Sequence, residues 1–243
     1  MLRIAFYGSA VYACVSLTVD PAFAQQCQPT SHAAASVSET AGAGGTDKEV
    51  SIDFDHFATA TAPEGFLSIV NGTGKPADWE IRPEPTAPSS PNVLAQISME
   101  TESFRFPLLI YKKFAAKNVE VTVQFKPVSG KIDQAAGVVA RYQDETHFYV
   151  VRANAFENDV RLYKVVDGVR HPISGASALV TTGKWHDVQL SVNGTHFRVC
   201  FDGIPLFEAE DDTYQQAGRV GLSTKSDGVI AFDNLHVVDM EEP

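Results

Sequence analysis

Residues 137–169 read GVVARYQDETHFYVVRANAFENDVRLYKVVDGV and contain three strand-length runs separated by turn residues. Each run alternates between apolar and other side chains with a period of two, as a half-buried strand does. In the middle run Tyr149, Val151 and Ala153 share one face, which is typical of a core. The opposite face combines an aromatic side chain with hydrogen-bonding groups. A sheet surface that binds a sugar or another small substrate needs that combination.

The same pattern of short strands continues through most of the chain. Strand-length apolar runs alternate with turn pairs such as Asp167-Gly168, Asn193-Gly194 and Asp202-Gly203, and no helical periodicity is visible beyond the first two dozen residues. Many short strands joined by turns of this kind are typical of an antiparallel sandwich or barrel. We therefore predict an all-β fold, an antiparallel jelly-roll β-sandwich.

The first 24 residues have the layout of a secretory signal peptide. Arg3 precedes an apolar run over residues 4–19, and the small-x-small sequence Ala22-Phe23-Ala24 follows. The run is shorter than the roughly 20 apolar residues that a membrane-spanning helix needs. We therefore expect cleavage, a secreted or periplasmic protein and no stable membrane insertion. A retained anchor is one alternative, and lipidation at Cys14 is another.

Residues 25–50 predict a flexible linker, and residues 51–243 predict the folded domain. The linker contains no Phe, Trp, Tyr, Leu or Ile, so it has too little apolar surface to offset the entropy of ordering. Cys27 lies within it. In an oxidising compartment Cys27 and Cys200 can pair, because they are the two cysteines left after cleavage. Two free thiols are the alternative.

The charge of the chain argues against one class of partner. The formal net charge is −11, and an acidic protein is repelled by nucleic acid. We therefore expect no nucleic-acid partner. Solubility is a sufficient reason for the acidic balance.

Polar and cationic side chains recur on the strand faces that point away from the predicted core. If these strands are neighbours in one sheet, the side chains converge on a single groove. The alternative is a solvated outer face whose charges protect the sheet edges. The predicted substrate-binding residues are Arg141, Arg152, Asn154, Arg161, Tyr163 and Lys225.

Two blocks of the sequence carry a family resemblance. Residues 119–165 and the closing block FRVCFDGIPLFEAEDDTYQQAGRVGLSTKSDGVIAFDNLHV, residues 197–237, resemble secreted bacterial proteins with a concanavalin A-like (laminin G-like) jelly roll. These are grouped with family 16 glycoside hydrolase-like and 3-keto-disaccharide hydrolase domains. The resemblance covers roughly residues 51–239. It implies a concanavalin A-like sandwich with a carbohydrate or glycoside ligand, on a fold that hosts lectins, binding modules and hydrolases alike.

The carboxylates of the chain do not predict classical glycoside hydrolysis. No strand carries the Glu-x-Asp-x-x-Glu spacing of a retaining glycosidase. Hydrolysis of a 3-keto-glycoside needs less, because the ketone acidifies a neighbouring C–H group and one base with one charge-stabilising group could suffice. His147 and His171 are the candidate bases. Each can equally be an ordinary surface histidine.

A structural calcium site is a further prediction. Asp53 and Asp55 lie near the first strand and Asp233 near the last, and the resemblance implies that these strands pair. Carboxylate oxygens suit Ca²⁺, while isolated surface carboxylates are the alternative. For the whole chain we predict a secreted carbohydrate- or glycoside-binding domain. A hydrolase of 3-keto-glycosides or other glycosides ranks second, and a structural envelope protein ranks third.

Overall fold

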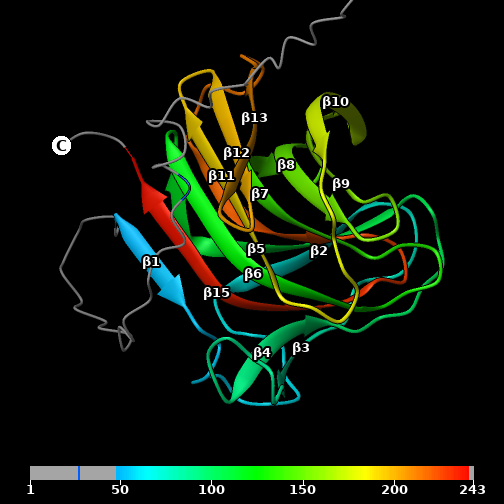
Figure 1. Cartoon of the computed structure of the whole chain (residues 1–243). Coiled ribbons are helices and arrows are strands. Elements are labelled where there is room, and N and C mark those ends of the chain that lie inside the picture. The colour runs from blue at the N-terminus through cyan, green and yellow to red at the C-terminus, as the bar shows by residue number, and fades with distance from the viewer. Residues whose placement is uncertain (1–26, 28–47, 241–243) are drawn as a thin grey trace, which may run out of the picture.

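The computed structural model describes Cys27 and residues 48–240 of the chain. Within this part, fifteen β-strands form two antiparallel sheets that pack face to face, with no helix (Figure 1). The prediction of an all-β antiparallel sandwich is therefore confirmed. The predicted signal peptide and Cys14 lie outside the described residues. No helix of the length and hydropathy of a membrane span occurs in the described part.

Sheet A contains the first and last strands of the domain. Its order is β13-β12-β11-β6-β15-β4-β3, and β1 pairs with β15 at the side. Glu49 and Val50 are the first residues of β1, so they belong to the sandwich and not to the predicted linker. The strands of sheet A are β1 (Glu49–Ile52), β3 (Trp79–Pro83), β4 (Asn92–Gln96), β6 (Val119–Ser129), β11 (His186–Asn193), β12 (His196–Phe201), β13 (Ile204–Glu210) and β15 (Val229–Asp239).

Sheet B contains the stretch that decided the fold prediction. Its order is β10-β9-β8-β7-β14-β5-β2, and the three predicted runs become β7, β8 and β9. The sequence did not predict β10, because Pro172 and Gly175 interrupt its pattern. The strands of sheet B are β2 (Phe66–Gly72), β5 (Arg105–Ala116), β7 (Ala135–Asp144), β8 (His147–Asn154), β9 (Asp159–Val166), β10 (Val169–Ser177) and β14 (Gly218–Thr224).

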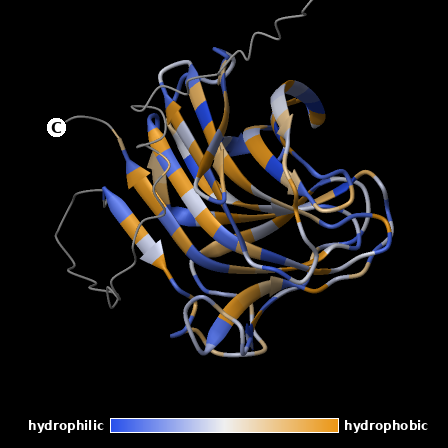
Figure 2. Cartoon of the chain, viewed as in Figure 1, coloured by the Kyte–Doolittle hydropathy of each residue, from blue (hydrophilic) through white to orange (hydrophobic). Residues whose placement is uncertain are grey.

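The main core lies between the two sheets. Tyr149, Val151 and Ala153 are fully buried there, as their strand parity predicts. The ring of Tyr149 meets that of Phe197 from sheet A at 4.7 Å between centroids. Figure 2 shows the alternation of hydrophobic and hydrophilic residues along the strands that supply this core. Each fully buried large apolar side chain contributes roughly 1.5–3 kcal/mol, so this layer is the main source of stability.

The face of sheet B that points away from sheet A is closed over part of its area. Asn71 of β2 donates hydrogen bonds to the carbonyl oxygens of Glu145 (3.0 Å) and Gly168 (3.3 Å), in the turns after β7 and β9. Opposite corners of the curved sheet therefore touch. A second apolar cluster is buried beneath this contact, formed by Leu108, Ile110, Val139, Tyr142, Phe148, Val150 and Val165.

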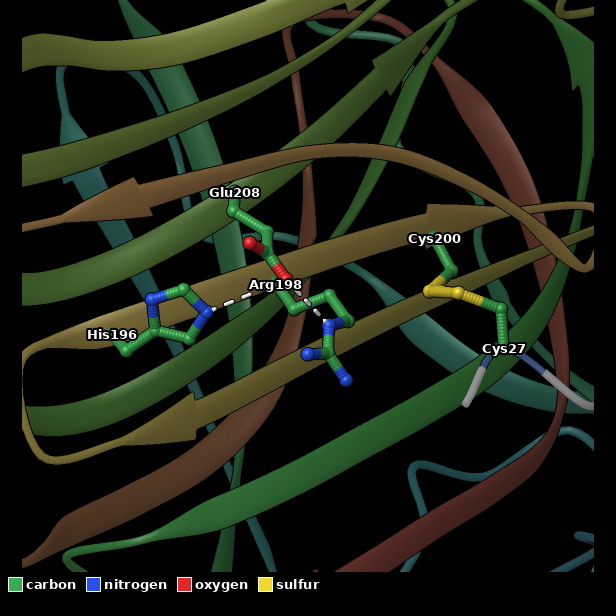
Figure 3. The surroundings of a disulfide bond; sticks show 5 residues. All are labelled: Cys27, His196, Arg198, Cys200 and Glu208. Carbon is green, nitrogen blue, oxygen red and sulfur yellow. Dashed lines mark hydrogen bonds and ion pairs between the residues drawn. A yellow bond between two sulfur atoms is a disulfide. The ribbon is translucent and has the colours of Figure 1, made fainter. Parts of the chain in front are cut away.

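A disulfide joins Cys27 to Cys200 of β12, 173 residues later in the chain. The pairing that the sequence left open is therefore formed, and it anchors the predicted linker to sheet A at this point. Figure 3 shows the same strand carrying Arg198 and His196, whose side chains approach the carboxylate of Glu208 on β13. Disulfides are typical of oxidising compartments.

Candidate functional site

Five of the six predicted binding residues gather on the part of the outer face of sheet B that the second apolar cluster leaves open. Strand pairing sets Arg152 opposite Arg161, and Asn154 opposite Asp159, on β8 and β9. We call the group that they form with their neighbours the polar corner. It consists of Asp133, Arg152, Asn154, Glu157, Asp159, Arg161, Tyr163, Arg170 and Lys225.

Three carboxylates of the polar corner hold its cations in place. Arg152 donates from both Nη atoms to Glu157, at 3.2 and 3.0 Å, and from Nη2 to Asp159 at 2.5 Å. Arg161 donates from Nε to the second oxygen of Asp159. The hydrogen bond and the charge of Arg152 lower the pKa of Glu157, so this carboxylate is ionised at neutral pH.

A second pair of contacts links β8 to the neighbouring loops. Asp133 is buried and accepts hydrogen bonds from Asn154 Nδ2 at 3.1 Å and from Lys225 Nζ at 2.5 Å. Asp227 fixes the loop that carries Asp133, because its carboxylate accepts three successive backbone N–H groups, those of residues 131–133. The polar corner is thus preorganised by the loops before β7 and after β14.

The turn between β8 and β9 follows from its sequence. Asn154 Oδ1 accepts the backbone N–H groups of Phe156 (2.8 Å) and Glu157 (3.2 Å), as asparagine does in turns. Asn158 adopts a φ of 50°, in the left-handed region that asparagine tolerates better than most residues. This local geometry directs the Glu157 carboxylate toward Arg152.

Aromatic rings flank the cations. The guanidinium of Arg170 on β10 lies 3.7 Å from the ring centroid of Phe106 and 5.8 Å from that of Tyr163. Arg152 also lies 5.8 Å from the Tyr163 centroid, so this ring stands between two arginines. Beside them is a shallow depression of about 210 Å³, which Asp159, Arg161, Gly175, Ala176 and Ser177 line.

The sequence reasoning missed five contributors to this region. Three are the carboxylates, and the other two are Phe106 and Arg170. The presence of carboxylates could have been predicted, because a buried arginine such as Arg152 requires an opposite charge. The sequence does not show which carboxylates these are, because the partner depends on which loops lie beside β8 in space. With paired charges, several donors and two rings, the arrangement can bind sugar hydroxyls and pack against a sugar face.

The prediction that Arg141 lines the same groove is wrong. Its side chain is fully buried and donates hydrogen bonds of 2.7 Å to the carbonyl oxygens of Lys117, Tyr214 and Gly194. The reason is a β-bulge in β7 between Ala140 and residue 144, where Arg141 has a φ of 47°. A bulge breaks the period-two alternation on which the parity argument rests.

Neither candidate base lies at the polar corner. His147 begins β8, five residues before Arg152 and therefore roughly 17 Å away along the strand. Its Nδ1 lies 2.8 Å from Asp144, and that hydrogen bond raises the pKa of His147. His171 is exposed on β10 and follows Arg170 directly, so its side chain points to the opposite face.

The three predicted calcium ligands lie near one another, but they anchor loops. The expected pairing of β1 with β15 is present. Buried Asp233 accepts the backbone N–H and the hydroxyl of Ser89, each at 2.8 Å, and Asp55 accepts the N–H of Asn92 at 2.8 Å. Asp53 accepts the N–H of Asp55. No group of three or more His, Cys, Asp or Glu in the described ranges could hold a metal ion, so the predicted calcium cluster is not formed.

Burial also changes the acidity of one of these carboxylates. It raises the pKa of Asp233 to about 6, although the hydrogen bonds from Ser89 oppose the shift, and the nearby Asp55 adds to it. The shift is opposite in direction to that of Glu157 in the polar corner, whose pKa is lowered.

Comparison with solved structures shows the same fold in carbohydrate-binding proteins. The carbohydrate-binding module CBM66 from Bacillus subtilis has a TM-score of 0.58 and 15% identity, over 75% of this chain and 99% of that one. The exoplasmic/lumenal domain of VIP36 in its Ca²⁺/Man-bound form has a TM-score of 0.54 and 10% identity, over 81% and 91%. At these identities the likeness shows the fold alone.

Two sequence comparisons add to this. A TPR repeat-containing protein of Treponema pallidum (strain Nichols) is 32% identical over 103 residues, which span 42% of this chain and 13% of that protein, about an eighth of its length. None of these matches names a 3-keto-disaccharide hydrolase, so that part of the resemblance stays a prediction. The model of the family "Galactocerebrosidase, C-terminal lectin domain" matches residues 116–240, just over half of the chain. With its lectin-like sandwich, the chain therefore belongs to the galactocerebrosidase C-terminal lectin domain family.

Proposed function

We propose that this protein is a secreted carbohydrate-binding module and that the polar corner is its ligand site. The observation that carries the proposal is the convergence of Arg152, Asn154, Arg161, Tyr163 and Lys225 from three neighbouring regions of sheet B. The membership in a lectin-domain family supports a sugar as the ligand.

The rest of the same sheet face directs the ligand to this corner. The second apolar cluster fills the other part of the face, and its side chains are buried. The shallow depression beside Arg161, a half-exposed side chain, offers a sugar hydrogen-bonding groups at this corner. Sugars bind through hydroxyl groups and through the apolar face of the ring, and Arg161 with Tyr163 offers a partner for each.

Secretion is part of the proposal. The disulfide between Cys27 and Cys200 supports it, because such bonds persist in oxidising compartments and are rare in the cytosol. The signal-peptide layout of residues 1–24 is consistent with the same compartment.

Binding without catalysis ranks above hydrolysis for a physical reason. The carboxylates of the polar corner are held in ion pairs by Arg152, Arg161 and Lys225, and Arg152 lowers the pKa of Glu157, which makes Glu157 a poor general acid. Among the described residues, neither candidate histidine reaches the corner. A 3-keto-glycoside hydrolase is therefore the second candidate, and a structural envelope protein the third.

A glycan array tests the proposal, with wild-type protein and two variants, Arg161→Ala and Tyr163→Ala. We expect saturable binding by the wild type, a loss of at least tenfold in each variant and no sugar product. Arg82→Ala, at an exposed position of β3 in sheet A, is the matched control and should bind as the wild type does. Unchanged binding in both polar-corner variants would show that the ligand does not bind at the polar corner. Release of a sugar product would favour the hydrolase.

A further inference from the structure

The cations of the polar corner differ in whether they have a carboxylate partner. Arg152, Arg161 and Lys225 are each paired with one or two carboxylates at ion-pair distance. The negative charges of their partners Glu157, Asp159 and Asp133 are thereby balanced by cations. The neighbouring carboxylate of Asp227 accepts hydrogen bonds from the backbone N–H groups of residues 131–133, in the loop before β7. Arg170 takes part in none of the ion pairs formed among the described residues.

The surroundings of Arg170 make the lack of a carboxylate partner energetically unfavourable in the protein without ligand. Its Nε is buried and has no hydrogen-bond partner among the described residues, and the same is true of Nε of Arg152. Burial lowers the pKa of Arg170 to about 10, and the nearby charge of Arg152 acts in the same direction, while Tyr163 and Asp133 oppose the shift. A desolvated cation without a partner costs free energy, which an anion can recover on binding.

The position of Arg170 lets a ligand reach it. The residue as a whole is partly exposed although its Nε is buried, and its Nη atoms are not among the buried unpaired atoms of the described residues. Its guanidinium lies against the Phe106 ring and near that of Tyr163. A planar guanidinium held by a ring on one side keeps its N–H fork available on the other, in the geometry that carboxylate and sulfate groups match.

We infer that the polar corner binds an acidic saccharide, whose carboxylate or sulfate group pairs with Arg170 while its sugar ring contacts Tyr163 and Arg161. This inference rests on the proposed function and names the class of ligand within it. Glu157, Asp159 and Asp133 do not repel such a ligand strongly, because each is already paired with a cation. The sugar ring distinguishes the ligand from a free anion, which would meet only the guanidinium.

The experiment compares acidic glycans with neutral counterparts of the same shape. Full-length protein with its disulfide intact is titrated with trigalacturonate, with its fully methyl-esterified form, with a sulfated oligosaccharide from the array and its desulfated form, and with sodium sulfate alone. The variants are Arg170→Gln and, as a matched control, Arg219→Gln, an exposed position of β14 in the same sheet.

We expect at least one acidic glycan to bind the wild type tenfold or more tightly than its neutral counterpart. In Arg170→Gln the ratio of acidic to neutral glycan affinity should fall to about one, and in Arg219→Gln both the affinities and their ratio should persist. Equal affinities for acidic and neutral glycans would overturn the inference and leave the carbohydrate-binding proposal in place. The absence of binding to every glycan would overturn both. Sulfate binding as tight as the best acidic glycan would reduce the site to a simple anion site and overturn the inference.

A second measurement uses the acidic glycan that the titration identifies. Because Arg170 has no polar partner among the described residues, Arg170→Met keeps the packing against Phe106 and should leave the melting temperature within a few degrees of the wild type. The acidic glycan should raise the melting temperature of the wild type and not of this variant. If the variant is stabilised by the acidic glycan as much as the wild type, Arg170 does not contact the anion and the inference fails.

Discussion

Arg141 and Arg170 are both desolvated arginines of sheet B, and burial lowers the pKa of each, yet their surroundings differ. Arg141 donates to three backbone carbonyl oxygens at 2.7 Å. Nε of Arg170 has no hydrogen-bond partner among the described residues. The contrast teaches that desolvation alone does not identify a candidate binding residue. A guanidinium whose donors all go to backbone carbonyl groups is part of the fold, whereas one with unpaired donors can accept a ligand.

Arg105 repeats the pattern of Arg141 at the start of β5. Its fully buried guanidinium donates to the carbonyl oxygens of Lys75, Ser226 and Pro76 and to the hydroxyl of Ser98. The chain thus uses two arginines as cross-links between loops. At the polar corner, Arg170 combines partial exposure with aromatic neighbours.

The largest expected effect is at Arg141. Arg141→Met leaves three carbonyl groups, one in a buried and two in part-buried contacts, without this donor, which costs roughly 1–3 kcal/mol for each of them and about 5 kcal/mol in total. Urea unfolding measures this cost. The affinity of the remaining folded molecules for the glycan should not change. A variant that unfolds like the wild type but has lost binding would reverse the roles assigned to the two arginines.

Arg152 should show an intermediate effect. Arg152→Met removes the partner of Glu157 and one of the two partners of Asp159, so we expect a loss of about 3 kcal/mol in the free energy of unfolding. The retained pair of Asp159 with Arg161 limits the loss. The double variant with Asp159→Asn should recover part of it. If the two substitutions are strictly additive, the two side chains are not coupled in solution.

Burial shifts the pKa of a carboxylate as well, that of Asp233, and this shift makes the stability of the protein depend on pH. The folded-state pKa of Asp233 is raised to about 6, so protonated Asp233 is favoured in the folded state. Its contribution to stability is therefore present below the ordinary pKa of aspartate and is lost as the pH rises to about 6. The loss corresponds to about 2–3 kcal/mol at 1.36 kcal/mol per pH unit.

Asp233→Asn isolates this contribution. The difference in unfolding free energy between the variant and the wild type should shift in favour of the variant between about pH 4 and pH 6.5. A constant offset from altered hydrogen bonds to Ser89 does not affect this slope. A difference that is independent of pH would show that Asp233 titrates as an exposed carboxylate does.

The smallest effect on stability is expected at Arg161. Its side chain is 49% exposed, so Arg161→Ala should change the free energy of unfolding only slightly, as for other exposed ion pairs. The same substitution should reduce glycan affinity at least tenfold. Thermal unfolding and titration on one protein sample compare the two quantities directly. A large loss of stability with unchanged affinity would place Arg161 with Arg141, among the residues that only support the fold.

The alternation of residues along β8 and β9 was enough to predict which side chains share a face. It separated Tyr149 and Val151 from Arg152, and it also left Tyr163 on the polar side. Period-two alternation is a local property of an extended backbone, so it can be read from neighbouring residues alone. The same argument failed at Arg141, because the bulge that reverses its direction has no clear signature in the sequence.

The sequence by itself determined the all-β sandwich, the turns and the common face of five of the six predicted binding residues, which meet at the polar corner. Tertiary structure alone decided which carboxylates pair with those residues, that the rest of the face is filled by a second apolar cluster, and that Asp53, Asp55 and Asp233 anchor loops. It also decided that Nε of Arg170 has no partner among the described residues. The physical reason is that strand formation depends on residues adjacent in the chain. A hydrogen-bond or ion-pair partner depends on distances of a few ångströms between segments far apart in the chain, which only the folded sheets define.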